Sequence, residues 1–120
     1  MSYDDKIKEI IGESEVTLFM KGTPEAIMCG NSERALGALR RVGAPITTVD
    51  VLVDMQIRED LSAAYGWPTI PQIFVKGELI GGADIVEEME KSGDLEKTLV
   101  EKLGDAFWER RGERTIALVG

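Results

Sequence analysis

The chain has 120 residues and a mass of 13.2 kDa, which is the size of one compact domain and too short for two. Hydrophobic residues make up 43% of the chain and charged residues 30%, a composition that excludes a disordered protein. The net charge is -8 and the pI is near 4.6, so nucleic acid and anionic membrane surfaces would repel the protein, and we expect neither as a partner.

The start of the chain and its cysteine content limit the location and the chemistry. No apolar stretch approaches the roughly 20 residues of a membrane span, and residues 1–6 lack the basic and apolar regions of a secretory signal. We therefore expect a protein of the cytosol or of an organelle matrix, and the cytoplasmic location is the one we predict. The single cysteine, Cys29, excludes an intramolecular disulfide, and the absence of histidine excludes Ser-His-Asp triads, Cys-His dyads and histidine metal sites.

The first third of the chain predicts a helix, a strand and a second helix. Residues 2–12 place their isoleucines on one helical face, and the apolar run 16–20 is typical of a strand covered on both sides. Turn residues at 21–25 follow. The next helix is expected to begin at Asn31 or Ser32, because either side chain can cap a helix.

The remainder continues the alternation of strands and helices. A strand is expected at 46–51, a helix at 54–66 and a hairpin at 73–80, where a Gly-containing turn separates two strand-like runs. Two further helices are expected to begin at Asp84 and Asp94, with Asp84 as a capping residue. The order predicts an α/β fold, a small mixed sheet with helices on both faces.

Cys29 lies in the predicted loop between the first strand and the second helix. A lone cysteine is usually a small buried apolar side chain, and this is one interpretation. The other is a reactive thiolate, because the unpaired N–H groups and the dipole at a helix start stabilise negative charge. Lys21, at the end of the strand, would add positive potential. The position of Cys29 favours the thiolate.

Two other segments each have two interpretations. Residues 67–72 contain two prolines before a strand, so the bond preceding Pro71 is either trans in a rigid loop or cis. Gly81 and Gly82 either allow the close approach of a ligand or only turn the chain into the next helix. Asp84 either contributes to a site or only caps that helix.

Taken together, these segments resemble a monothiol glutaredoxin. The resemblance rests on the order and spacing of Phe19–Glu25, Cys29-Gly30-x-Ser32, Trp67–Gln72 and Gly81-Gly82-x-Asp84. It covers residues 4–103 and implies a thioredoxin-like fold, a four-stranded mixed sheet flanked by helices, with a cis peptide bond before Pro71. The chain would then consist of a glutaredoxin domain at 1–103 and an extension at 104–120.

The resemblance also implies a glutathione site. The implied residues are Lys21, Cys29, Arg58, Ile70, Pro71, Gly82 and Asp84. Cys29 would be the catalytic thiolate, and Lys21 and Arg58 would bind the glycyl carboxylate. Ile70 would pair with the ligand main chain, and Gly82 with Asp84 would hold the glutamyl end. Alternatively, the two cations are ordinary solvated surface charges.

Three functions remain open at this point. Members of the family commonly hold a 2Fe-2S cluster between two subunits. The cluster needs four ligands, and each subunit of this chain supplies one, the Cys29 thiolate. Two glutathione thiolates would supply the other two, which gives a glutathione-bridged homodimer with Cys29 as the metal ligand. BolA-like proteins and iron-sulfur apoproteins are the implied partners. The second function is a glutathione-dependent oxidoreductase acting on protein mixed disulfides. The third is a metal-free adaptor.

Some positions depart from the family pattern. Asn31 stands where the family has phenylalanine, and this exchange of an aromatic for an amide is expected to raise solvent access to a cluster. Ala83 replaces a frequent cysteine and removes any resolving thiol. Residues 104–120 lie beyond the resemblance and are interpreted either as a packed or partly disordered tail, or as a strand at 115–119 that adds to a sheet edge or a partner.

Overall fold

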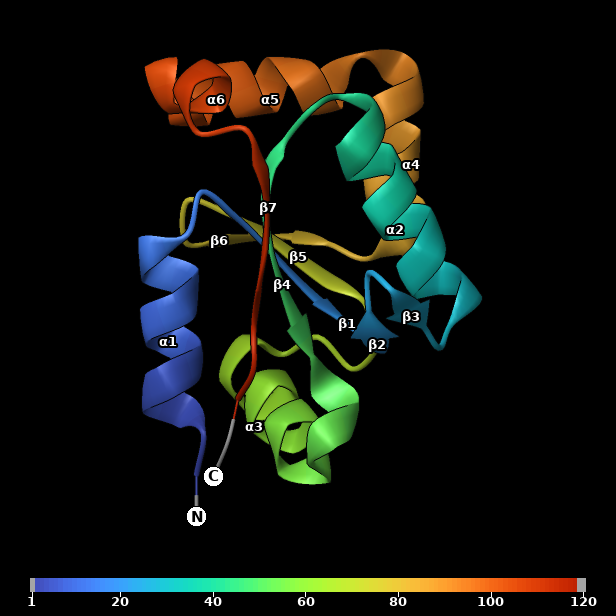
Figure 1. Cartoon of the computed structure of the whole chain (residues 1–120), viewed down its shortest axis with the longest axis vertical. Coiled ribbons are helices and arrows are strands. Elements are labelled where there is room, and N and C mark those ends of the chain that lie inside the picture. Colours follow the sequence, from blue (N-terminus) through green and yellow to red (C-terminus); the bar gives the residue numbers. More distant parts are fainter. Residues whose placement is uncertain (1, 119–120) are drawn as a thin grey trace.

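The computed structural model describes residues 2–118 and shows a twisted sheet with helices packed around it (Figure 1). The elements in chain order are α1 (Asp4–Glu13), β1 (Val16–Met20), β2 (Gly22–Thr23), β3 (Ala26–Ile27), α2 (Gly30–Arg41), β4 (Pro45–Asp50), η1 (Val51–Val53), α3 (Met55–Tyr65), β5 (Gln72–Val75), β6 (Glu78–Gly81), α4 (Ala83–Ser92), α5 (Asp94–Leu103), α6 (Asp105–Glu109) and β7 (Gly112–Ile116). None of the helices in this part of the chain is long and apolar enough to cross a lipid bilayer.

The main sheet within residues 2–118 has five strands in the order β6-β5-β1-β4-β7. β1 runs parallel to β4 and antiparallel to β5, and β5 and β6 form the predicted hairpin. These four strands make up the mixed sheet expected from the sequence. They confirm the four-stranded sheet implied for residues 4–103, and the extension adds a fifth strand, β7.

β7 pairs in parallel with β4, with Thr115 opposite Thr48 (Figure 1). The hydroxyl oxygens of these two threonines lie 2.9 Å apart. The expected addition to a sheet edge is therefore found, at the edge of this chain's own sheet. The strand begins at Gly112 rather than at residue 115, and residue 119, the last of the expected strand, lies outside the described part of the chain.

The sheet separates two hydrophobic cores, because side chains alternate between its faces along each strand. Leu18 faces the core formed with α2, α4, α5 and α6, whereas Phe19 faces the core formed with α1 and α3. The extension contributes to both: Phe107 of α6 lies in the first core and Leu118, after β7, in the second. The extension is thus packed into the body of the protein.

Helix α3 shows how local signals fix the elements around the site. The Asp54 carboxylate accepts a hydrogen bond of 2.9 Å from the backbone N–H of Gln56, so Asp54 caps the helix as predicted. Gly66 ends the helix with a φ of 67°, a left-handed conformation in which glycine carries no steric cost. The chain then passes directly into the loop with the two prolines.

Candidate functional site

The segment from β1 to Cys29 is a small hairpin, β2–β3, that is tied to the sheet and to α2. The backbone N–H of Gly22 donates to Asp50 Oδ1 at 2.9 Å, and that of Lys21 donates to Ser32 Oγ at 3.0 Å. Gly22 has a φ of 96°, and a Cβ at this position would collide with the carbonyl oxygen of Ala26. The hairpin therefore fixes where the chain enters α2, and with it the position of Cys29.

Cys29 is the N-cap residue of α2, two or three residues before the predicted caps Asn31 and Ser32. Its side chain is half-buried and forms no disulfide, which rules out the interpretation as a fully buried apolar residue. The backbone N–H of Ser32 contributes most to holding the pKa of the Cys29 thiol below its ordinary value of 9.0. The backbone N–H of Asn31, the Ser32 hydroxyl and the charge of Lys21 lower the pKa further, while partial burial opposes them.

A cavity of about 400 Å³ lies next to the start of α2. Its lining residues are Asn31, Trp67, Thr69, Ile70, Pro71, Gly82, Ala83, Asp84 and Ile85. Four of the expected site residues are thus brought together here, and the bond between Ile70 and Pro71 is cis, as the resemblance implied. The other three expected residues, Cys29, Lys21 and Arg58, are not part of the lining. The charge of Lys21 lowers the pKa of the Cys29 thiol, and Arg58 is exposed on α3.

Gly82 allows the two loops of this cavity to meet. A Cβ at Gly82 would lie 3.3 Å from the carbonyl oxygen of Pro71 and 3.5 Å from Nε1 of Trp67. The Trp67 Nε1 atom is buried and has no hydrogen-bond partner within the described part of the chain. The sequence did not single out this indole, because nothing local indicates that it would face the glycine turn.

The sequence also missed Arg34, which joins α2 to α4 at the rim of the cavity. Its Nη1 donates to Asn31 Oδ1 at 3.0 Å, and its Nη2 donates to Asp84 Oδ1 and Glu87 Oε1, each at 2.8 Å. Asp84 does not cap α4, which begins after Gly82 without a side-chain cap. The predicted capping role of Asp84 is therefore wrong, because its carboxylate is engaged by a guanidinium from the neighbouring helix.

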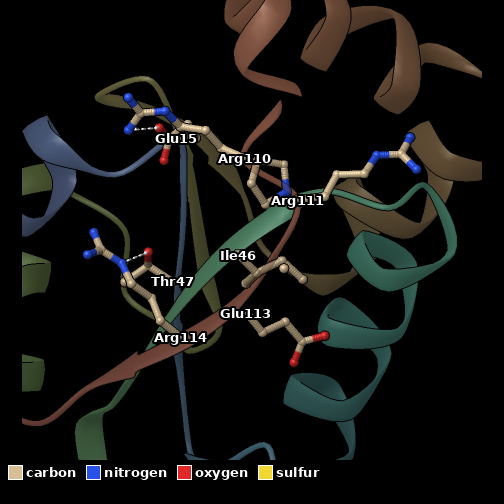
Figure 2. A pocket seen from close by; sticks show the side chains of 9 residues that line it. Glu15, Ile46, Thr47, Arg110, Arg111, Glu113 and Arg114 are labelled. Carbon is tan, nitrogen blue, oxygen red and sulfur yellow. Dashed lines mark hydrogen bonds and ion pairs between the residues drawn. The ribbon is translucent and has the colours of Figure 1, made fainter. Parts of the chain in front are cut away.

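A second cavity, of about 240 Å³, lies at the opposite end of the parallel strands, where β1, β4 and β7 begin (Figure 2). Its arginines already bind groups of the protein. Arg110 pairs with Glu15 at 3.3 Å, and Arg114 donates from Nε to Thr47 Oγ1 at 2.9 Å. The guanidinium of Arg111 lies over the Trp108 ring, 4.7 Å from its centre. Two of these contacts, those of Arg110 and Arg114, hold the extension against the sheet. The candidate functional site is therefore Cys29 with the first cavity, at the other end of the strands.

Known proteins are similar to this chain in sequence. A family model described as Glutaredoxin matches residues 16–80. Monothiol glutaredoxin-S11 of Oryza sativa subsp. japonica is 47% identical over 100 residues, which cover 83% of this chain and 20% of that longer protein. Probable monothiol glutaredoxin 2 of Rickettsia felis is 45% identical over 93 residues, which cover 78% of this chain and 89% of the rickettsial protein.

Solved structures agree with the sequence relatives. A monomeric truncated mutant of Trypanosoma brucei 1-C-Grx1 superimposes with a TM-score of 0.76 at 42% identity, covering 85% of this chain and 92% of that one. The buckwheat glutaredoxin-glutathione complex superimposes with a TM-score of 0.71 at 26% identity, covering 81% and 86%. The order of the motifs, the thiol at the start of α2, the cis-proline loop and these matches have one explanation: the chain belongs to the monothiol glutaredoxin family.

Proposed function

We propose that this protein binds glutathione in the cavity beside Cys29 and, as a glutathione-bridged homodimer, carries a 2Fe-2S cluster to iron-sulfur apoproteins. The observation that carries the proposal is a half-buried thiol of lowered pKa at the start of α2, next to a cavity bounded by the cis-proline loop and the glycine turn. BolA-like proteins are proposed as alternative partners, and the cytoplasm as the location, where a lone thiol stays reduced.

The ligand set supports cluster carriage by a dimer. Within residues 2–118 there is no group of three or more cysteine and acidic side chains that could hold a metal ion. Cys29 is the only cysteine of the chain, so one subunit provides one of the four ligands of a 2Fe-2S cluster. Two Cys29 thiolates and two glutathione thiolates would complete the set. A cluster held by so few protein groups is suited to transfer.

Anaerobic reconstitution tests the proposal. The protein is mixed with ferrous iron, sulfide and glutathione, and the product is followed by visible absorption and by native mass spectrometry. We expect a coloured dimer that contains two glutathione molecules and one 2Fe-2S unit. The Cys29→Ser variant should remain colourless and monomeric. A wild-type protein that also stays colourless under these conditions would refute cluster carriage.

The Asn31→Phe variant should hold the cluster longer than the wild type. Asn31 is exposed on the rim of the cavity, two residues after the proposed ligand Cys29. An aromatic ring there would shield the cluster from water and oxygen, and we expect the half-life of the visible absorption in air to rise at least twofold. The matched control is Glu33→Gln, an exposed position in the first turn of α2. An unchanged half-life in Asn31→Phe would contradict the exposure argument.

The lowered pKa of Cys29 favours a second candidate, a glutathione-dependent oxidoreductase. The Cys29 thiolate would attack the glutathione sulfur of a protein mixed disulfide, forming a Cys29-glutathione disulfide and releasing the protein thiolate. A second glutathione thiolate would then attack that disulfide, restoring the Cys29 thiolate and leaving as oxidised glutathione. A colourless monomer that rapidly reduces a glutathionylated peptide would favour this enzyme over the cluster carrier.

A further inference from the structure

Arg34 lies where two polar groups of the cavity rim come together. Of its three partners, Asn31 and Asp84 both line the cavity, and the guanidinium binds both. Glu87, the third partner, is on the next turn of α4 and does not line the cavity. A cation from α2 is therefore held beside the carboxylate that the proposed function assigns to the glutamyl end of glutathione.

The contacts of Arg34 divide into a firm pair and an open pair. The pair with Glu87 is two-pronged, with Nε donating to Oε2 at 3.2 Å and Nη2 donating to Oε1 at 2.8 Å, and the Glu87 side chain is only 23% exposed. The contact with Asp84 is a single hydrogen bond to a side chain that is 90% exposed. Planar two-pronged pairing fixes a guanidinium better than one hydrogen bond does. Asp84 can turn toward a ligand while Glu87 keeps Arg34 in place.

The neighbouring charges match the free end of a γ-glutamyl peptide. That end carries an ammonium and a carboxylate on one carbon atom, so the two ligand charges lie only a few ångströms apart. Asp84 Oδ1 and Arg34 Nη2 are 2.8 Å apart and have the opposite two charges. This inference rests on the proposed glutathione site and concerns which residues of that site recognise the glutamyl end.

We propose that Arg34 is a recognition residue for glutathione: it binds the α-carboxylate of the glutamyl end while Asp84 binds the α-ammonium. Asn31 takes part by accepting a hydrogen bond from Nη1, which draws the guanidinium toward the rim. The site would thus select peptides with an intact γ-glutamyl group over peptides that lack either of its charges.

Three ligands separate the two contacts in calorimetric titrations of the reduced protein. They are glutathione, 4-aminobutyryl-cysteinyl-glycine, which lacks the α-carboxylate, and glutaryl-cysteinyl-glycine, which lacks the ammonium. Arg34→Gln should weaken glutathione binding at least fivefold and change the affinity for the aminobutyryl peptide less than twofold. Arg34→Lys keeps the charge but loses the planar pair of N–H donors. It should lower the affinity less than Arg34→Gln does, and only for ligands that have the α-carboxylate. Asp84→Asn should weaken glutathione but not the glutaryl peptide.

Arg41→Gln is the matched control, because Arg41 also joins α2 to α4, through Glu90, but Glu90 does not line the cavity whereas Asn31 and Asp84, two partners of Arg34, do. It should leave the affinity for all three peptides unchanged. If Arg34→Gln lowers the affinities for glutathione and for the aminobutyryl peptide equally, or lowers neither, the proposed carboxylate contact is overturned while glutathione binding stands. If the wild type binds no glutathione, the proposed function fails and this inference fails with it.

Discussion

Replacing Phe107 by alanine is expected to lower the free energy of unfolding by about 3–5 kcal/mol. Phe107 is fully buried in the core that α2, α4, α5 and α6 share, and its removal leaves a cavity that rigid neighbours cannot fill. Since the whole stability of a domain this size is roughly 5–15 kcal/mol, the change is a large fraction of the total. Urea unfolding followed by circular dichroism measures it.

The neighbouring Trp108 supplies the matched control. Its side chain is 56% exposed, and its ring lies under the Arg111 guanidinium and forms a T-shaped contact with the Phe107 ring. Trp108→Ala should therefore cost about 1 kcal/mol or less, as expected for one aromatic contact and one exposed cation-π contact. Equal and small losses in the two variants would show that α6 is a dispensable attachment and not part of the core.

The result matters because the extension changes the sheet as well as the core. In the four-stranded arrangement implied by the family resemblance, β4 would be an edge strand with unpaired backbone groups along one side. β7 pairs along this side from Gly112, opposite Pro45, to Ile116, opposite Val49. An exposed strand edge invites pairing with other chains. The extension thus transfers the edge from a strand of the family fold to a strand of its own.

Elements with strong local signals could be predicted from the sequence. The strand at residues 16–20 agrees with β1, because four of its five side chains are apolar and such a short apolar run is typical of a buried strand. The helix between Asp54 and Gly66 agrees with α3 because both of its ends carry recognisable capping residues. Each of these signals lies within the segment itself, so no knowledge of distant contacts is needed.

The features that the sequence did not predict depend on contacts between residues far apart in the chain. β7 is mostly polar and exposed, so its strand begins where β4 offers a partner and not where the sequence becomes apolar, at residue 115. The candidate site likewise combines predicted features with one that depends on a distant contact. Pro71, Gly82 and Asp84 meet as the resemblance implied, but the link from Arg34 to Asp84 requires α2 and α4 to pack side by side, 50 residues apart in the chain.

The other large effect is expected at Cys29. Since the chain has one cysteine, alkylation by iodoacetamide reports on this thiol alone, and Cys29→Ser should abolish both alkylation and mixed-disulfide formation with glutathione. In the wild type, we expect the alkylation rate to rise with pH about a midpoint below 9.0, because the backbone N–H of Ser32 above all lowers the pKa of the thiol.

Variants around the thiol should move this midpoint in a fixed direction. Ser32→Ala removes a hydroxyl, and Lys21→Gln a positive charge, that lower the pKa of Cys29, so both should raise the midpoint. Lys76→Gln is the control, because Lys76 lies in the β5–β6 turn at the far end of the sheet and should leave the midpoint unchanged. A wild-type midpoint at or above 9.0 would contradict a stabilised thiolate.

The lowered pKa also predicts how folding stability depends on pH. The thiol loses its proton at a lower pH in the folded protein than in the unfolded chain, where its pKa is near the ordinary 9.0. Below the folded pKa both states are protonated and the thiol contributes nothing; above 9.0 both are ionised and its contribution is complete. The stability of the wild type relative to Cys29→Ser should therefore rise with pH between these two values and fall again when the pH is lowered. Urea midpoints of the two proteins measure this difference, in which other titrating groups cancel. A difference that stays constant over the whole range would mean that fast alkylation reflects the accessibility of Cys29 and not a stabilised charge.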